Sequence, residues 1–155
     1  MNSGDQQTGA GAGAGAFAGT GSGSGSGGGD TGSDAVVDLP LFDHEKLEVY
    51  RVAREFVVLA TQLLAHKMPR ELRDQFDRAS LSILFNIGEG AGKTAKADKQ
   101  RSYEIARGST TEAATQLDVM HIRGLIAQDQ YRRARTLLVR VAQMLSRLCG
   151  IPRGT

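Results

Sequence analysis

The last helix-length segment of the chain spaces its apolar residues as a packed α-helix does. Between residues 128 and 149 they step by 3, 4, 3, 4 and 3 positions, at Tyr131, Ala134, Leu138, Val141, Leu145 and Leu148. This heptad-like step puts them all on one helix face, whereas a β-strand needs a period of two. The pattern predicts a helix from about Gln128 to Cys149 that buries this face against other helices.

Three earlier segments are helical by the same criterion, and no window alternates apolar and polar residues. Asp43 is a suitable N-cap for the first helix, and Pro69 ends it. The glycines at 88, 90 and 92 are expected to break the second. The predicted helices span about 43–68, 70–87, 97–125 and 128–149, with a loop at 89–96. Four helices with short connections indicate an all-α fold, an antiparallel up-and-down four-helix bundle.

The first helix carries a wider apolar arc than a bundle helix needs. Its two stripes are Leu47, Tyr50, Ala53, Val57, Ala60 and Leu64, and Val49, Val52, Phe56, Leu59 and Leu63. Because a helix wetted on one side needs an apolar stripe of only ~100°, we expect this helix to pack on two sides. One side faces its own bundle, and the other is expected to face another subunit.

The second and third helices each present one row of core residues. The row of the second is Leu72, Phe76, Ala79, Ile83 and Ile87, and that of the third is Tyr103, Ala106, Thr110, Ala113, Ala114, Leu117, Met120 and Gly124. Many residues of the third row are small, and small residues allow two helices to approach closely.

The first 38 residues have the composition of a linker. They hold 13 of the 20 glycines and no Lys or Arg, and their charges are Asp5, Asp30, Asp34 and Asp38. Such a segment buries too little apolar surface to offset its chain entropy. Residues 1–38 are therefore predicted to be a disordered tail, and 39–155 the bundle domain. That domain carries 19 basic and 13 acidic residues, a formal charge of +6 against +2 for the whole chain.

Other features of the sequence indicate a soluble, cytoplasmic protein. The single cysteine excludes an internal disulfide and suits a reducing interior. The N-terminus lacks the basic start and apolar run of a signal peptide. No stretch approaches the ~18 apolar residues of a membrane span.

The segment from Gly88 to Thr94 looks like a phosphate-binding loop but lacks two of its requirements. It reads Gly-Glu-Gly-Ala-Gly-Lys-Thr, whereas a P-loop needs a glycine where Ile87 stands and a strand before it. A glycine-rich helix end and loop is the favoured interpretation, so nucleotide hydrolysis is not expected.

The chain also lacks the ligand pattern of a metal site in a bundle. A di-metal carboxylate site needs a Glu from each of two helices and a Glu-x-x-His from each of the others. Only Asp118 with His121 resembles one half of that motif, and His44 and His66 lie near opposite ends of the first helix. Cys149, in a leucine-rich helix, is interpreted as a small buried thiol. We expect no metal, no cofactor and no enzymatic activity.

Basic residues gather on one face of the fourth helix, opposite the apolar face formed by Tyr131, Ala134, Leu138, Val141, Leu145 and Leu148, which we call the leucine seam. Arg132, Arg133, Arg140 and Arg147 form this face, which we call the arginine stripe. The loop before the third helix is predicted to carry a second group, Lys93, Lys96, Lys99 and Arg101, with Asp98 as its only acid. A solvated helix surface explains any single arginine, but the grouped set indicates contact with a phosphate backbone. Without stacking aromatics or a helix-turn-helix signature, such binding is expected to be electrostatic and weakly sequence-specific.

Four groups of residues follow one another in the order of a known family. They are Leu47-Glu48-Val49-Tyr50 with Ala53; Phe76 with Arg78-Ala79 and Ser82-Ile83; Asn86-Ile87-Gly88-Glu89-Gly90; and Ala106-Arg107-Gly108-Ser109 with Glu112, Gln116 and Leu117. Over about 42–148 the chain resembles the bacterial four-helix-bundle proteins named for the intervening sequence of 23S ribosomal RNA. That group includes the accessory variability determinant of diversity-generating retroelements.

The resemblance implies a homopentamer of up-and-down bundles without enzymatic activity. Family members are encoded within ribosomal RNA intervening sequences, or serve as basic partners of nucleic acid and a reverse transcriptase. Arg107 and Gly88 depart from the family pattern, because those positions usually hold apolar or small aliphatic residues. Our first hypothesis is an oligomer that binds RNA or a ribonucleoprotein through the arginine stripe and residues 93–101. The alternative is a protein-interaction scaffold or accessory subunit, for example of a reverse transcriptase.

We interpret the polar residues shared with the family as structural. Ser109, Glu112 and Gln116 form a polar strip beside the core row of the third helix, facing the end of the second helix with Asn86 and Glu89. We hypothesise that Asn86 closes the open carbonyl groups at that helix end. The other four are expected to form a hydrogen-bond network between the helices, which would fix their register.

Overall fold

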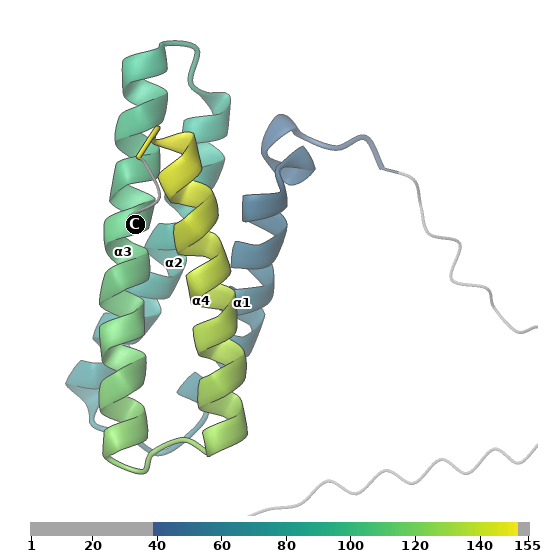
Figure 1. Cartoon of the computed structure of the whole chain (residues 1–155). Helices are drawn as coiled ribbons and strands as arrows, with labels where there is room; N and C mark the ends of the chain where they lie inside the picture. Colours follow the sequence, from purple (N-terminus) through teal and green to yellow (C-terminus); the bar gives the residue numbers. More distant parts are fainter. Residues whose placement is uncertain (1–38, 152–155) are drawn as a thin grey trace, which may run out of the picture. The chain divides into compact units, whose positions relative to one another are not determined.

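The computed structural model describes residues 39–151, and these form a four-helix bundle. A short 3-10 helix, η1 (Asp43–Lys46), precedes α1 (Glu48–Leu64), α2 (Arg70–Gly92), α3 (Lys96–Ile122) and α4 (Gln128–Leu148). Consecutive helices run antiparallel, and no strand occurs among the described residues (Figure 1). The predicted all-α bundle is confirmed. The predicted disordered tail, residues 1–38, lies outside the described residues.

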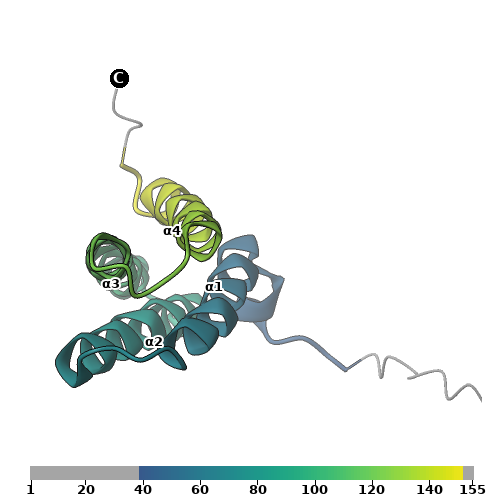
Figure 2. The same cartoon turned by 90° about the horizontal axis from the view of Figure 1, so that it is seen from below.

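Each helix packs against two neighbours, so the four enclose one core (Figure 2). Both α1 and α3 contact α2 and α4. The largest buried side chains are Phe56, Leu63, Phe76, Ile83, Ile87, Leu117, Met120, Leu138, Val141 and Leu145. Phe56 of α1 and Phe76 of α2 meet edge to face, with ring centroids 6.1 Å apart. The predicted core rows therefore face inward, except that Gly124, after α3, and Leu148, at the end of α4, are exposed.

The first helix is shorter at both ends than predicted. Asp43 does not cap it, because Asp43 begins η1 and the extended backbone of Leu47 separates η1 from α1. The Arg51 guanidinium of α1 donates to the carbonyl oxygens of Glu45 and Lys46, at 3.2 and 3.0 Å, and ties the two helices together. At the other end α1 stops at Leu64 rather than Met68. A residue before proline avoids the helical conformation, which excludes Met68 from the helix.

The second helix continues through the glycines that were predicted to break it. It runs to Gly92, so the loop predicted at 89–96 is reduced to residues 93–95. Gly90 faces α3 so closely that an added Cβ would lie 2.6 Å from Tyr103 Cε1 and 3.2 Å from Ser102 Cβ. This glycine therefore permits close helix packing and does not end the helix.

The third and fourth helices end in the same way, at a glycine in the left-handed conformation. Gly124 has φ +67° and Gly150 has φ +68°. After α3, the amide of Leu125 donates to the carbonyl of Met120 at 2.9 Å; after α4, the amide of Ile151 donates to that of Ser146 at 2.9 Å. These are Schellman bonds, which satisfy the last free carbonyl groups of a helix. The prediction that α3 reaches residue 125, with Gly124 in its core row, was wrong for this reason.

None of the helices within residues 39–151 combines the length and the apolar character that crossing a membrane requires.

Replacing Gly90 with alanine should lower the melting temperature, whereas replacing Gly108 should raise it. At Gly90 the new methyl group collides with buried Tyr103, and overpacking of ~1–3 kcal/mol outweighs the ~1 kcal/mol by which alanine is favoured over glycine in a helix. At Gly108, which also lies inside a helix, nothing lies within 4 Å of an added Cβ. Thermal denaturation followed by circular dichroism measures both. A Gly90→Ala variant that melts above the parent protein would contradict the close approach.

Candidate nucleic-acid interface

Burial of the leucine seam of α4 turns the arginine stripe toward solvent. Ala134, Leu138, Val141 and Leu145 are buried, and all four arginines of the stripe are exposed. Arg133, Arg140 and Arg147 are seven residues apart, so they follow one line along the helix at a rise of ~10.5 Å per step. The helix thus presents a straight row of positive charge.

The stripe does not stand alone, because α1 supplies an opposite wall. A groove of about 420 Å³ lies between the two helices, and we call it the α1–α4 groove. It is lined by Glu55, Val58, Leu59 and Gln62 of α1 and by Arg132, Arg133, Thr136, Leu137 and Arg140 of α4. The α1 residues were not predicted as site residues. Their spacing at 55, 58, 59 and 62 marks one helix face, and the up-and-down topology already placed α1 next to α4.

The charge of one arginine of the stripe is partly neutralised by a glutamate on the surface of the same bundle. Arg140 Nη2 lies 3.4 Å from Glu48 Oε1 of α1, with both side chains largely exposed. An exposed pair of this kind contributes only ~0–1 kcal/mol to stability, but it lowers the charge that Arg140 offers to a ligand. Arg132, Arg133 and Arg147 form no ion pair with any residue in the described part of the chain.

Arg147 lies apart from the α1–α4 groove. It lines a smaller hollow of about 240 Å³, where the start of α1 meets the end of α4, together with Leu47, Val49 and Met144. The structure therefore groups three of the four predicted arginines in one groove and places the fourth farther along the same helix.

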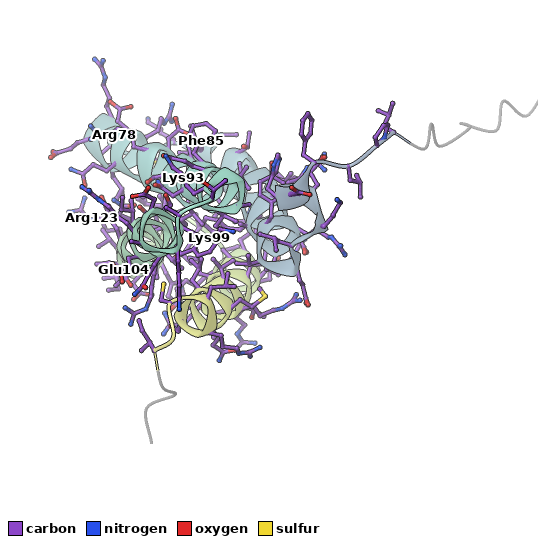
Figure 3. The ribbon with its side chains drawn as sticks, turned by 90° about the horizontal axis from the view of Figure 1, so that it is seen from above. Arg78, Phe85, Lys93, Lys99, Glu104 and Arg123 are labelled. Carbon is purple, nitrogen blue, oxygen red and sulfur yellow. The ribbon has the colours of Figure 1, made fainter. Side chains whose placement is uncertain are left out.

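The second basic group was predicted to be a loop, but three of its four residues are helical. Lys93 follows the last residue of α2, and Lys96, Lys99 and Arg101 belong to the first turns of α3. Figure 3 views this end of the bundle, with Lys93 and Lys99 labelled. Lys93 Nζ pairs with Glu89 Oε1 at 2.9 Å, and this hydrogen bond and charge raise the pKa of Lys93. Arg132 and Arg133 are in the first turns of α4, at the opposite end of the bundle, so these two arginines are separate from the second basic group.

The shared polar residues form three small contacts rather than one network. Ser82 and Ser109 join α2 to α3 through their hydroxyl groups, 2.8 Å apart. Asn86 Nδ2 donates to the carbonyl oxygen of Ser82 at 2.8 Å and to its hydroxyl at 3.2 Å. Glu89 points instead to Lys93. The prediction that Asn86 closes a helix end is wrong, because α2 continues to Gly92.

The third contact is a pair within α3. Gln116 Nε2 donates to Glu112 Oε1 at 3.2 Å. Gln116 is buried. Among the described residues, its Oε1 is the one buried side-chain nitrogen or oxygen atom without a hydrogen-bond partner. Sequence reasoning named both residues but missed Ser82 as the link between Asn86 and Ser109. The signal was present, since Ser82 and Asn86 are separated by one helical turn.

The residues weighed as chemical candidates have packing contacts in the structure. His121 stacks on Tyr131 with ring centroids 4.2 Å apart, and Tyr131 Oη donates to Asp118 Oδ1 at 2.8 Å. No three metal-ligating side chains gather within residues 39–151. Burial of the Cys149 thiol raises its pKa, and the negative charge of Glu104 raises it further. The reactive thiolate form is therefore disfavoured.

Comparison with known proteins identifies the family of the chain. A family model described as 23S rRNA-intervening sequence protein matches residues 45–147. The chain belongs to this family. No curated protein matches it. The chain is also similar to a crystal structure, at 1.70 Å resolution, of a protein with unknown function from the S23 ribosomal protein family of Bacteroides thetaiotaomicron. The two are 21% identical with a TM-score of 0.61, over 65% of this chain and 97% of the other, so they share a fold.

Two departures from the pattern of the 23S rRNA-intervening sequence family have local contacts. Arg107 Nε of α3 donates to Ser146 Oγ of α4 at 3.2 Å, so this arginine links two helices. Gly88 faces α1, where an added Cβ would lie 3.9 Å from Tyr50 Cε2, an ordinary contact distance. A small aliphatic residue at 88 therefore also fits this bundle.

Replacing Glu112 with alanine should lower the melting temperature. The buried amide of Gln116 then loses its acceptor, and a buried polar group without a partner costs ~1–3 kcal/mol, reduced here because Glu112 is exposed and water can replace it. Glu112→Gln keeps an acceptor oxygen at that position and is the matched control. Thermal denaturation measures stability. An unchanged melting curve together with lost RNA binding would instead assign Glu112 to a ligand contact.

Proposed function

We propose that this member of the 23S rRNA-intervening sequence family is a non-catalytic, oligomeric bundle that binds RNA or a ribonucleoprotein. The supporting observation is the α1–α4 groove, where three exposed arginines face one glutamate and two of the three have no ion-pair partner among residues 39–151. Exposed, unpaired arginines bind phosphate groups by releasing the counterions of the nucleic acid. The formal charge of +6 on residues 39–155 attracts a polyanion toward this surface.

The chemistry of the groove favours binding with little sequence specificity. Sequence reading requires side chains that reach base edges from an element inserted in a groove of the nucleic acid. The stripe instead runs along the outside of a packed bundle helix, where arginines reach phosphates first. The basic group at Lys93, Lys96, Lys99 and Arg101 provides a second, weaker electrostatic contact.

Replacing Arg132 and Arg133 together with glutamine should weaken RNA binding by roughly tenfold or more. In a plot of the logarithm of affinity against that of salt concentration, the slope should fall by roughly 0.7 for each arginine that contacts a phosphate of a single strand. Fluorescence anisotropy with a labelled RNA over a salt series measures both quantities.

The matched control removes the same charge elsewhere. Arg78 of α2 and Arg123, after α3, are exposed and form no ion pair with another described residue (Figure 3). If Arg78→Gln with Arg123→Gln weakens binding as much as the stripe variant does, net charge explains the affinity and the groove has no special role. Affinity independent of salt would count against phosphate contact altogether.

Exposed apolar residues support a second candidate, a protein-interaction scaffold or accessory subunit such as that of a reverse transcriptase. Phe85 of α2 is 65% exposed and Ile105 of α3 is 46% exposed. Phe85 lies three residues beyond Ser82, and Ile105 four residues before its partner Ser109. In antiparallel helices both steps lead toward the same end, and both exposed side chains lie about one turn from the Ser82–Ser109 contact, so they share one α2–α3 face. Apolar groups gathered on one face favour a protein contact.

We infer that this α2–α3 face, rather than the outer side of α1 that the sequence led us to expect, contributes to a homo-oligomer. The family resemblance implies that the oligomer is a pentamer. Light scattering of the intact chain should give a mass several times that of one chain, and Phe85→Ser should reduce it. Ile122→Ser, which changes an even more exposed side chain near the α3–α4 turn, is the control and should leave the mass unchanged. A monomer in both the parent and the variants would contradict the oligomer.

A further inference from the structure

The two walls of the α1–α4 groove differ in charge. On α4 the wall carries Arg132, Arg133 and Arg140, and no acid. On α1 the wall carries Glu55 and Gln62, and Glu48 continues the same line toward the start of the helix, since the three are seven residues apart. Among the residues that line the groove, positive charge therefore follows one lip, and acidic or neutral groups follow the other. Just beyond this lining, Glu48 pairs with Arg140, and the exposed Arg51 of α1 donates to the carbonyl oxygens of Glu45 and Lys46.

The floor between these walls is apolar. Leu59 and Leu137 are buried at its base, and Val58 is 56% exposed. The volume of about 420 Å³ falls within the range of ~300–1,000 Å³ that is usual for clefts that hold organic ligands. An elongated ligand with anionic groups along one edge and flat, weakly polar groups along the other would match both lips and the floor.

A single nucleic-acid strand has this asymmetry, and a duplex does not. A strand can place its phosphates on α4 and turn its bases to the apolar floor and to Gln62. A duplex carries phosphates on both of its strands. If one backbone followed the arginines of α4, the other would be forced toward the α1 lip and Glu55, which has no ion-pair partner among the described residues, and like charges close together repel each other.

We propose that the α1–α4 groove binds one strand of RNA lengthwise, with phosphates on the arginine lip and bases against Val58 and the α1 lip, and that it disfavours duplex RNA. This inference rests on the proposed RNA-binding function and specifies the form of RNA that the groove accepts. Because aromatic residues are absent from the lining, the bases contact aliphatic groups, and the strand is held mainly through its phosphates.

The test compares two RNA probes on the full-length protein. One is a fluorescein-labelled oligouridine of roughly 12 nucleotides, a length within the ~4–16 nucleotides that single-strand sites cover. The other is a blunt duplex whose two strands have this same length, so that it stays paired during the titration. Anisotropy titrations at equal salt should show the single strand bound roughly tenfold more tightly.

Two variants examine the α1 wall and the apolar floor separately, each with a control of identical chemistry elsewhere. Glu55→Gln should raise the affinity for the duplex and so reduce the difference in affinity between the two probes. Glu71→Gln, on the α2–α3 side, should leave this difference unchanged. Val58→Asp should weaken binding of the single strand, while Val139→Asp, equally apolar and 45% exposed on the α3 side of α4, should not. Circular dichroism establishes that each variant is folded, and Glu55→Gln tests the proposal without changing the apolar floor.

The outcomes separate this inference from the proposed function. Equal or tighter binding of the duplex, with affinity still dependent on Arg132 and Arg133, would overturn the single-strand proposal and leave the RNA-binding function in place. If neither probe binds, the single-strand proposal and the proposed RNA-binding function are both overturned. If neither Glu55→Gln nor Val58→Asp changes the difference in affinity between the two probes, the strand binds to another surface. That result would also overturn the proposal.

Discussion

The burial of one face of α4 determines the rotation of that helix about its axis, and most of the surface chemistry depends on this rotation. Once Leu138, Val141 and Leu145 are enclosed by the other helices, the arginines have no position except the solvent side. The same packing brings α1 beside α4 and so creates the groove. The hydrophobic effect, acting on the four buried residues of this face, thus positions charged groups that contribute little to stability themselves.

The features that depend on local periodicity were predictable from the sequence. The core rows of α1, α2 and α4 and the outward stripe follow from spacing alone, because a helix of 3.6 residues per turn converts spacing into direction. The features that depend on a distant partner were not. Gly90 looks like a helix breaker until Tyr103, on another helix, is known to occupy the space of its missing side chain. Likewise, the contact of Asn86 with Ser82 follows from their spacing within α2, but the bond from Ser82 to Ser109 appears only when α2 and α3 are placed side by side.

Formal charge overstates what the basic surfaces offer to a ligand. Glu48 is within 3.4 Å of Arg140, and Glu89 is within 2.9 Å of Lys93, so one arginine and one lysine already have partners. Neither pair was predicted. The Lys93 partner was detectable from the i,i+4 spacing on one helix, whereas Glu48 lies 92 residues away from Arg140 along the chain. For the 23S rRNA-intervening sequence family, a surface should therefore be compared between members by its unpaired charges rather than by its count of basic residues.

The close approach of α2 and α3 has a consequence for how this bundle can change. Since Gly90 and the ring of Tyr103 compete for one volume, neither position is free to enlarge alone. A larger residue at 90 becomes acceptable only with a smaller one at 103, or with a wider spacing of the whole helix pair. The second route would separate Ser82 from Ser109, whose hydroxyl groups need the present spacing to meet. The two positions therefore form a size-exchange pair, and relatives that accept bulk at one should show its loss at the other.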